Sequence, residues 1–151
     1  YEKAMRERTK LLKDMVREPS WYLALEKQMA EAGTSIHRNR LFALSELRAA
    51  QSDATTAFPA ADLELVHNEA PLPEDATSLR NALADNRMRD LSAGRTLIGP
   101  HRADLIGTFA AKVMPAKDCT TGEQKALLVS LIMANARAFS QSFCAPTLLM
   151  L

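Results

Sequence analysis

The sequence predicts an α+β fold in which an antiparallel helical lobe comes first and a smaller part with strands follows. As far as residue 92, apolar residues recur at helical spacing. Beyond Gly94 they form short runs separated by Gly and Pro, which is typical of strands and turns, before one more helical stretch. The chain has 151 residues, 47% hydrophobic and 25% charged, so its size and composition are those of a globular domain rather than a disordered one.

Two helices are expected first, over residues 1–17 and 20–51. Pro19 separates them, and Ser20 is a suitable N-cap for the second helix. A near-heptad apolar stripe begins at Trp21, and Gly33 interrupts it. Two interpretations stay open for this stripe: a long helix packed in an antiparallel pair, or an arm that contacts a partner or DNA.

An acidic connector is expected over residues 52–75. Residues 49–77 hold six acidic and no basic side chains, and their three prolines break the periodicity around one short strand at Leu63–Val66. A helix over residues 76–92 follows, and Gly94 stands where a helix C-terminal glycine belongs. The helical lobe is therefore placed at residues 1–92.

Strands are expected next, at Arg95–Ile98 and Ala103–Phe109, with a turn at residues 99–101. Residues 110–112 could turn the chain back towards Val113 and Met114. A loop at residues 115–121 leads to a helix at residues 122–139, and an apolar strand follows Pro146.

Charge and cysteine content exclude several classes of protein. The net charge is only +1, unlike that of histone-like proteins, and no apolar run reaches the ~20 residues of a membrane-spanning helix. Two cysteines, Cys119 and Cys144, cannot form a disulfide framework, so we expect a reducing cytoplasmic compartment.

The three histidines (His37, His67 and His101) lack metal-ligand spacing, so no metal site is expected. Residues 1–48 carry a net charge of +3, which could contact a phosphate backbone but is also usual for a solvated helix.

The two ends of the chain suggest a piece of a longer protein. The sequence opens on Tyr1 inside a helical pattern and closes on an apolar run after Pro146. Natural termini are usually exposed rather than buried. We therefore expect an internal fragment.

The segment at residues 118–128 is a short loop of small polar residues that opens directly onto a helix. Thr121 could cap this helix, and Glu123 would stabilise its first turn. Free backbone N–H groups at such a helix start attract anions. Local chemistry leaves two interpretations open, an ordinary capped helix or one that senses phosphate.

Two motifs carry a family resemblance. The run Thr120-Thr121-Gly122-Glu123-Gln124-Lys125 and the apolar helix after it resemble the signature motif of ABC-type ATPases, and the strand after Pro146 resembles the start of a Walker B strand. The run Gly99-Pro100-His101-Arg102 resembles the RecF family of bacterial recombination mediators, which is related to SMC proteins. Residues 1–8 and 21–33 resemble the helical lobe of that family, so the match spans nearly the whole chain.

The resemblance implies that residues 93–151 are the C-terminal part of an ABC-type (P-loop NTPase) head. In such heads the signature motif of one subunit contacts the ATP of the other, here through Thr121, Gly122, Gln124 and Lys125. Glu123 replaces the more common second glycine and would point away from the phosphate. Lys125 could equally be a solvated lysine. Arg95, His101 and Arg102 are candidates for DNA contacts, although His101 could simply be a hydrogen-bonded turn residue and Arg102 could pair with Asp104.

The resemblance also implies a function: ATP-dependent DNA binding at gaps and single/double-strand junctions, with RecA loading through RecO and RecR and a part in the SOS response. ATP and Mg²⁺ would be the cofactors of the intact parent, and slow hydrolysis would control its homodimerisation. The chain shows no Walker A pattern, no Walker B acids and no catalytic constellation. Alone it is expected to bind no cofactor and to hydrolyse no ATP. The alternatives are a non-enzymatic helical interaction module and a head fragment of another SMC-like repair ATPase.

Overall fold

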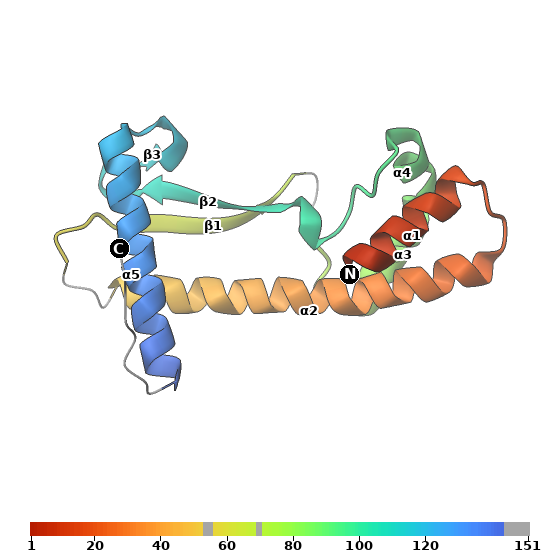
Figure 1. Ribbon diagram of the computed structural model, residues 1–151, viewed down its shortest axis with the longest axis horizontal. Helices are drawn as coiled ribbons and strands as arrows, with labels where there is room; N and C mark the ends of the chain where they lie inside the picture. Colours follow the sequence, from red (N-terminus) through yellow and green to blue (C-terminus); the bar gives the residue numbers. More distant parts are fainter. Residues whose placement is uncertain (53–55, 69–70, 144–151) are drawn as a thin grey trace. The chain divides into compact units, whose positions relative to one another are not determined.

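The computed structural model describes residues 1–52, 56–68 and 71–143 (Figure 1). Cys144 and the strand expected after Pro146 lie outside these residues. Within the described part, no helix combines the length and apolar character needed to cross a membrane.

The chain divides into two compact units, each made of two separate segments. Unit 1 comprises Tyr1–Arg40 and Val66–Asp104, and unit 2 comprises Leu41–Leu65 and Leu105–Leu151. Three elements, α2, β1 and β2, each have residues in both units.

The first helix, α1 (Glu2–Lys13), is shorter than the sequence predicts. Met15 adopts a left-handed backbone with φ of 52°, which a right-handed helix cannot include. The second helix, α2 (Pro19–Ser52), begins at the proline itself, because proline has no N–H that needs a partner at a helix start. Ser20 is therefore inside the first turn and not the N-cap; its hydroxyl donates to Glu18 Oε1 at 2.9 Å.

The buried face of α2 differs at its start from the stripe that the sequence predicts. Trp21 is 61% exposed, whereas Tyr22 and Glu26 are buried; Met29, a member of the predicted stripe, is buried as expected. The difference follows from the ion pairs of Glu26, which require that side chain to face inward. Gly33 does not interrupt α2 but allows close packing, because a Cβ there would lie 3.0 Å from Leu79 Cδ2.

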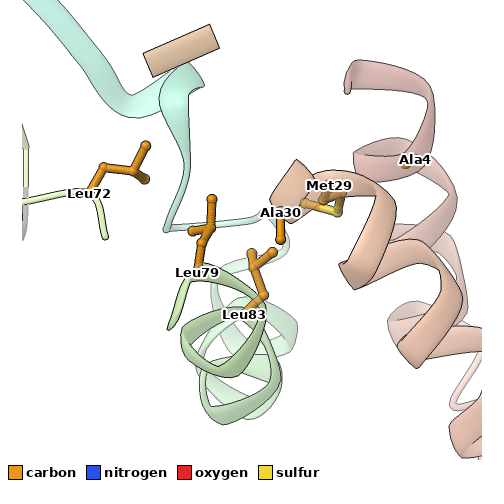
Figure 2. Packing of buried hydrophobic residues seen from close by; sticks show 6 residues of the cluster. All are labelled: Ala4, Met29, Ala30, Leu72, Leu79 and Leu83. Carbon is orange, nitrogen blue, oxygen red and sulfur yellow. The ribbon is translucent and has the colours of Figure 1, made fainter. Parts of the chain in front are cut away.

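Unit 1 has an apolar core between its helices. Figure 2 shows Leu79 and Leu83 from α3 directed towards Ala30 and Met29 from α2. Ala4 of α1 and Leu72 complete the buried cluster, and Ile98 packs against it. Segments from both parts of the unit therefore meet in one core.

The expected helix at residues 76–92 is two helices, α3 (Ala76–Asp85) and α4 (Arg87–Ala93). Asp75 caps α3 by accepting a hydrogen bond from the Ser78 N–H at 2.8 Å. Gly94 adopts φ of 66° and ends α4, so the predicted C-terminal glycine is confirmed.

Residues 95–98 do not form the predicted strand. Their polar groups bond to α4 and to the buried Arg8 instead of to a sheet: Asp90 Oδ1 accepts from the Leu97 N–H at 2.9 Å, and the Thr96 hydroxyl accepts from Arg8 at 3.3 Å. Gly99 follows with φ of 142°, a conformation that favours glycine.

The sheet has three strands in the order β1 (Ala61–His67), β2 (Ala103–Phe109) and β3 (Met114–Pro115). Strands are thus confirmed at two of the predicted places, and the predicted return of the chain after residue 109 is also present. β2 and β3 are antiparallel, with Thr108 opposite Pro115 and Phe109 opposite Met114.

The last helix, α5 (Thr121–Phe143), packs its Leu127 into the main buried cluster of unit 2. That cluster also contains Leu44, Ala61, Leu63, Phe109 and Cys119. A smaller cluster joins Ala134 and Ala138 of α5 to Ala50 of α2. The start of α5 is thereby anchored against the sheet.

Candidate nucleic-acid interface

A pocket of about 230 Å³ in unit 1 brings three arginines together. Its polar lining comes from α1 and from the segment after α4: Arg6, Thr9, Arg95, Thr96, His101 and Arg102. No acidic side chain lines it in the described part of the chain. Guanidinium groups present a planar fork of donors that fits phosphate, so the pocket has the charge and the donor type of an anion site.

A buried ion network fixes the walls of this pocket. Arg8 is fully buried on α1, and its Nε donates to Glu26 Oε1 at 3.0 Å while Nη1 donates to Asp90 Oδ2 at 2.7 Å. Its Nη2 donates to the Leu83 carbonyl at 2.6 Å. Because Asp90 also holds the Leu97 N–H, the network joins α1 to the segment that carries Arg95. The two walls of the pocket are therefore held together from behind.

His101 uses both ring nitrogens inside the protein. Nε2 lies 2.9 Å from the Thr96 carbonyl and must donate to it, so Nδ1 accepts from the Tyr1 hydroxyl at 2.9 Å. Burial lowers the pKa of His101, which keeps the ring uncharged at neutral pH. The structure thus places His101 in the pocket as a residue that orders the turn, and leaves Arg95 and Arg102 as the charged groups.

Arg102 is held at the turn by its backbone, since its N–H donates to the Gly99 carbonyl at 3.0 Å. The neighbouring Pro100 carbonyl accepts from Arg40 Nη1 at 2.6 Å. The side-chain Nε of Arg102 is buried and has no hydrogen-bond partner among the described residues.

The predicted signature loop lies in unit 2 and is capped by Thr120, not by Thr121. Thr120 Oγ1 accepts from the Glu123 N–H at 3.4 Å, and Glu123 Oε2 accepts from the Thr120 N–H at 2.9 Å. This reciprocal pair is a capping box, which requires the cap to stand three residues before the glutamate. α5 therefore begins at Thr121, immediately after its cap.

Glu123 also forms an ion pair with Lys112. The Lys112 ammonium and the hydrogen bonds from Thr120 lower the pKa of Glu123 to about 2, so the carboxylate is ionised at neutral pH. Its charge is directed at Lys112 and Thr120.

All four predicted ATP contacts are exposed, namely Thr121, Gly122, Gln124 and Lys125. Nothing lies within 4 Å of a Cβ built at Gly122, and helix geometry leaves the first N–H groups of α5 without intrahelical partners. Gln124 instead secures the preceding loop, because its Nε2 lies 3.0 Å from the Ala116 carbonyl and 3.2 Å from those of Lys117 and Cys119. An open helix start beside a lysine fits a phosphate group.

Sequence reasoning missed Arg6 and the Arg8 network. Both arginines lie among other charged residues of α1, but Arg8 stands four residues after Ala4 and four before Leu12, on the buried face of the helix, whereas Arg6 is exposed. Glu26 is 18 residues from Arg8 in the sequence, but the other partners are far away, at Leu83, Asp90 and the segment after Gly94. Only covariation among related sequences could have indicated such contacts.

Comparison with known sequences finds relatives over nearly the whole chain. The DNA replication and repair protein RecF of Mesorhizobium japonicum is 47% identical over 146 residues, which cover 91% of this chain and 38% of that protein. RecF of Brucella abortus is 46% identical over 162 residues, which cover 99% of this chain and 41% of that protein. The chain thus spans about two fifths of the length of these curated relatives. No family model matches it.

Solved structures share the fold. A structure of the recombination mediator protein RecF with ATP in the RecFOR pathway matches 100% of this chain with a TM-score of 0.77 and 19% identity, over 43% of its own length. A second RecF structure with an ATP analogue has a TM-score of 0.74 and 17% identity, and covers 97% of this chain and 42% of its own. The resemblance to RecF that the motifs predicted is confirmed.

Proposed function

We propose that this chain works as part of an ATP-controlled DNA-binding protein of the RecF type in DNA replication and repair. The observation that carries the proposal is the 46–47% identity to RecF proteins over at least 91% of the chain. The relatives' names supply the role in replication and repair, and the arginine pocket of unit 1 supplies a surface suited to DNA.

In this proposal, Arg6, Arg95 and Arg102 hold phosphates of the DNA backbone. Lys and Arg contacts to phosphate supply most of the sequence-independent affinity of DNA-binding proteins and fix their register on the duplex. His101 keeps the turn in place through Tyr1 and Thr96 rather than donating to DNA. The Arg8 network prevents the arginines from separating, so the pocket needs little reorganisation on binding.

In the same proposal, the start of α5 contacts ATP that is bound to a second copy of the protein. Residues 93–151 then belong to an ABC-type head, and residues 1–92 form a helical lobe. Backbone N–H groups at Thr121 and Gly122 and the ammonium of Lys125 would face the terminal phosphate, while Gln124 holds the loop that presents them. ATP with Mg²⁺ supplies the phosphoryl chemistry when bound; this chain supplies positioning and positive charge.

The proposed assembly and partners of the intact protein rest on the same sequence identity to RecF proteins. We assign to the intact protein an ATP-dependent homodimer, a preference for gapped DNA and single/double-strand junctions, cooperation with RecO and RecR in RecA loading, and a cytoplasmic location. The RecFOR pathway named for the solved structures of the same fold supports the RecO and RecR assignment.

The salt dependence of DNA binding tests the arginine pocket. Arg95→Gln should weaken binding to all DNA sequences and reduce the slope of log K against log salt by about one, as expected for one lost phosphate contact. Arg17→Gln removes the same charge from an exposed residue outside the pocket and is the matched control. Equal effects of the two variants would mean that only net charge matters, and would refute the proposed role of the pocket in DNA binding.

A further inference from the structure

The solvent-facing side of α1 carries a row of basic side chains, which we call the α1 stripe. Its members are all exposed and follow one another at steps of three, four and three residues: Lys3, Arg6, Lys10 and Lys13. The buried residues of α1, namely Ala4, Arg8 and Leu12, recur at steps of four. With about 3.6 residues per turn, the centres of these two sets lie on opposite sides of the helix.

The α1 stripe is separated from the acidic residues of its own helix. Glu2 and Glu7 lie just outside the stripe, one at each edge. Within residues 1–52, 56–68 and 71–143, no ion pair joins a member of the stripe to an acid. The helix therefore presents four cations to solvent together rather than a mixture of the two signs.

This arrangement is not the one that would best stabilise α1. Members of the stripe stand three or four residues apart, the spacing at which like charges on a helix repel and opposite charges attract. The helix dipole favours Lys10 and Lys13 in the last turn but disfavours Lys3 in the first. Helix stability thus does not account for the whole stripe, whereas a ligand with several negative charges in a row would.

The α1 stripe continues the arginine pocket. Arg6 belongs to both, since it lines the pocket together with Arg95 and Arg102. From Arg6 to Lys13 the helix advances by about 10 Å, at ~1.5 Å per residue. Three nucleotides of one DNA strand cover about the same length, at ~3.4 Å each along the duplex axis. A backbone that enters the pocket at Arg6 can therefore follow the stripe.

The helix is already held in place for such a ligand. On its opposite face, Arg8 donates to Glu26 of α2 and to Asp90 of α4. We propose that the backbone of one DNA strand lies along the α1 stripe and continues into the arginine pocket. The inference rests on the proposed DNA binding and adds a direction to it, because the DNA then leaves the pocket along α1 towards Lys13.

Removal of two charges from the stripe tests this inference in the intact protein. Lys10→Gln with Lys13→Gln should reduce the slope of log K against log salt by about two, on DNA of any sequence. Lys10→Arg with Lys13→Arg keeps both charges and should keep the wild-type slope. The matched control, Arg17→Gln with Arg38→Gln, removes two charges from exposed residues of unit 1 outside the stripe and should leave the slope unchanged.

A stability measurement separates lost binding from lost folding. In Lys10→Gln with Lys13→Gln, the relief of repulsion and the loss of the favourable dipole interaction oppose each other, so the urea midpoint should change little. If it falls instead, Lys3→Gln decides the matter. That variant removes a cation from the end of α1 that disfavours it, and it should reduce the salt slope by about one while preserving stability.

The outcomes separate the two proposals. If the stripe variants keep the wild-type salt slope while Arg95→Gln reduces it, the inference is wrong and the DNA-binding role of the pocket stands. Equal reductions in the stripe variants and in the control pair would show that only net charge matters, and would also overturn the inference. If the wild-type protein does not bind DNA even at low salt, the proposed function fails, and the inference fails with it.

Discussion

Unit 1 contains a buried cluster of charged side chains, whereas the charged cluster of unit 2 is accessible to water. In unit 1, Arg8, Glu26 and Asp90 are each at most 1% exposed, and Arg8 forms ion pairs with both acids. In unit 2, Lys112 and Glu123 pair at the start of α5 with side chains that are 51% and 23% exposed. Both clusters hold a candidate binding segment in place, but they do so in different dielectric surroundings.

The difference determines how firmly each segment is held. Buried charges cannot separate without leaving an uncompensated charge in the interior, which is strongly unfavourable. Exposed pairs are screened by salt and replaced by water at little cost. The arginine pocket should therefore keep its shape under most conditions, whereas the loop before α5 can adjust when a partner docks on it.

The largest effect should come from Arg8→Met, which leaves Glu26 and Asp90 buried without their shared cation. Breaking a buried pair from one side costs about 3–5 kcal/mol of unfolding free energy. The only tryptophan, Trp21, belongs to unit 1, so its fluorescence in urea reports the loss. Lys10→Met, an exposed change on the same helix, is the control and should have little effect. Comparable losses in the two variants would show that the network does not stabilise unit 1.

Substitution by alanine should have opposite effects on stability at the glycines of the two motifs. At Gly99 a Cβ would collide with the Tyr1 hydroxyl, and φ of 142° is unfavourable for any other residue, so Gly99→Ala should cost at least about 1–3 kcal/mol. At Gly122 a Cβ meets nothing within 4 Å, and alanine is a better helix former, so Gly122→Ala should not destabilise. The urea concentrations at the midpoint of unfolding, measured by circular dichroism, compare the stabilities of the two variants. A neutral Gly99→Ala would mean that this turn can change its backbone at no cost.

Sequence reasoning succeeded where the determinants are local. The left-handed Gly94, the strand at Ala103–Phe109 and the helix that begins beside Gly122 follow from residue types and spacing. It failed at Arg95–Ile98, where propensity favours a strand but Asp90 and Arg8 take the polar groups. Arg8 is 88 residues from Thr96 in the sequence, so no local pattern contains that contact.

The candidate sites divide in the same way. The helix start at Thr121 was predictable from a local run of residues, although its cap is one residue earlier, because the glutamate fixes a three-residue spacing. Arg95 and Arg102 were found through a motif, but their pocket also requires Arg6 from α1. The pairing of two distant segments was not visible in the sequence.

The two units should also differ in their response to acid. Burial lowers the pKa of His67 and His101 in unit 1 below the ordinary value of 6.5, so the unfolded chain binds protons more readily. The stability that these histidines contribute is present above pH 6.5 and is lost as the pH falls towards their folded-state pKa values. Glu123 in unit 2 contributes stability above pH 4.5 that is lost only as the pH falls towards about 2.

Urea midpoints by Trp21 fluorescence should therefore decrease between pH 7 and 5, and His67→Gln with His101→Gln should reduce that decrease. An unchanged pH dependence in the double variant would assign the effect to other groups.

The smallest effect on stability, and the sharpest on function, is expected for Gly122→Asp. A carboxylate in the first turn of a helix stabilises it by about 0.3–1 kcal/mol, and the space around Gly122 is open, so folding should be preserved. The same charge would stand where the proposed ATP phosphate of a second copy approaches. In the intact protein, ATP-induced dimerisation, followed by sedimentation, should then fail while equilibrium binding shows that each copy still takes up ATP.

Gly122→Asn is the uncharged control of similar size and should dimerise better than Gly122→Asp, because only the aspartate repels the phosphate. If Gly122→Asp dimerises normally with ATP, the start of α5 does not face the nucleotide, and its openness has another cause.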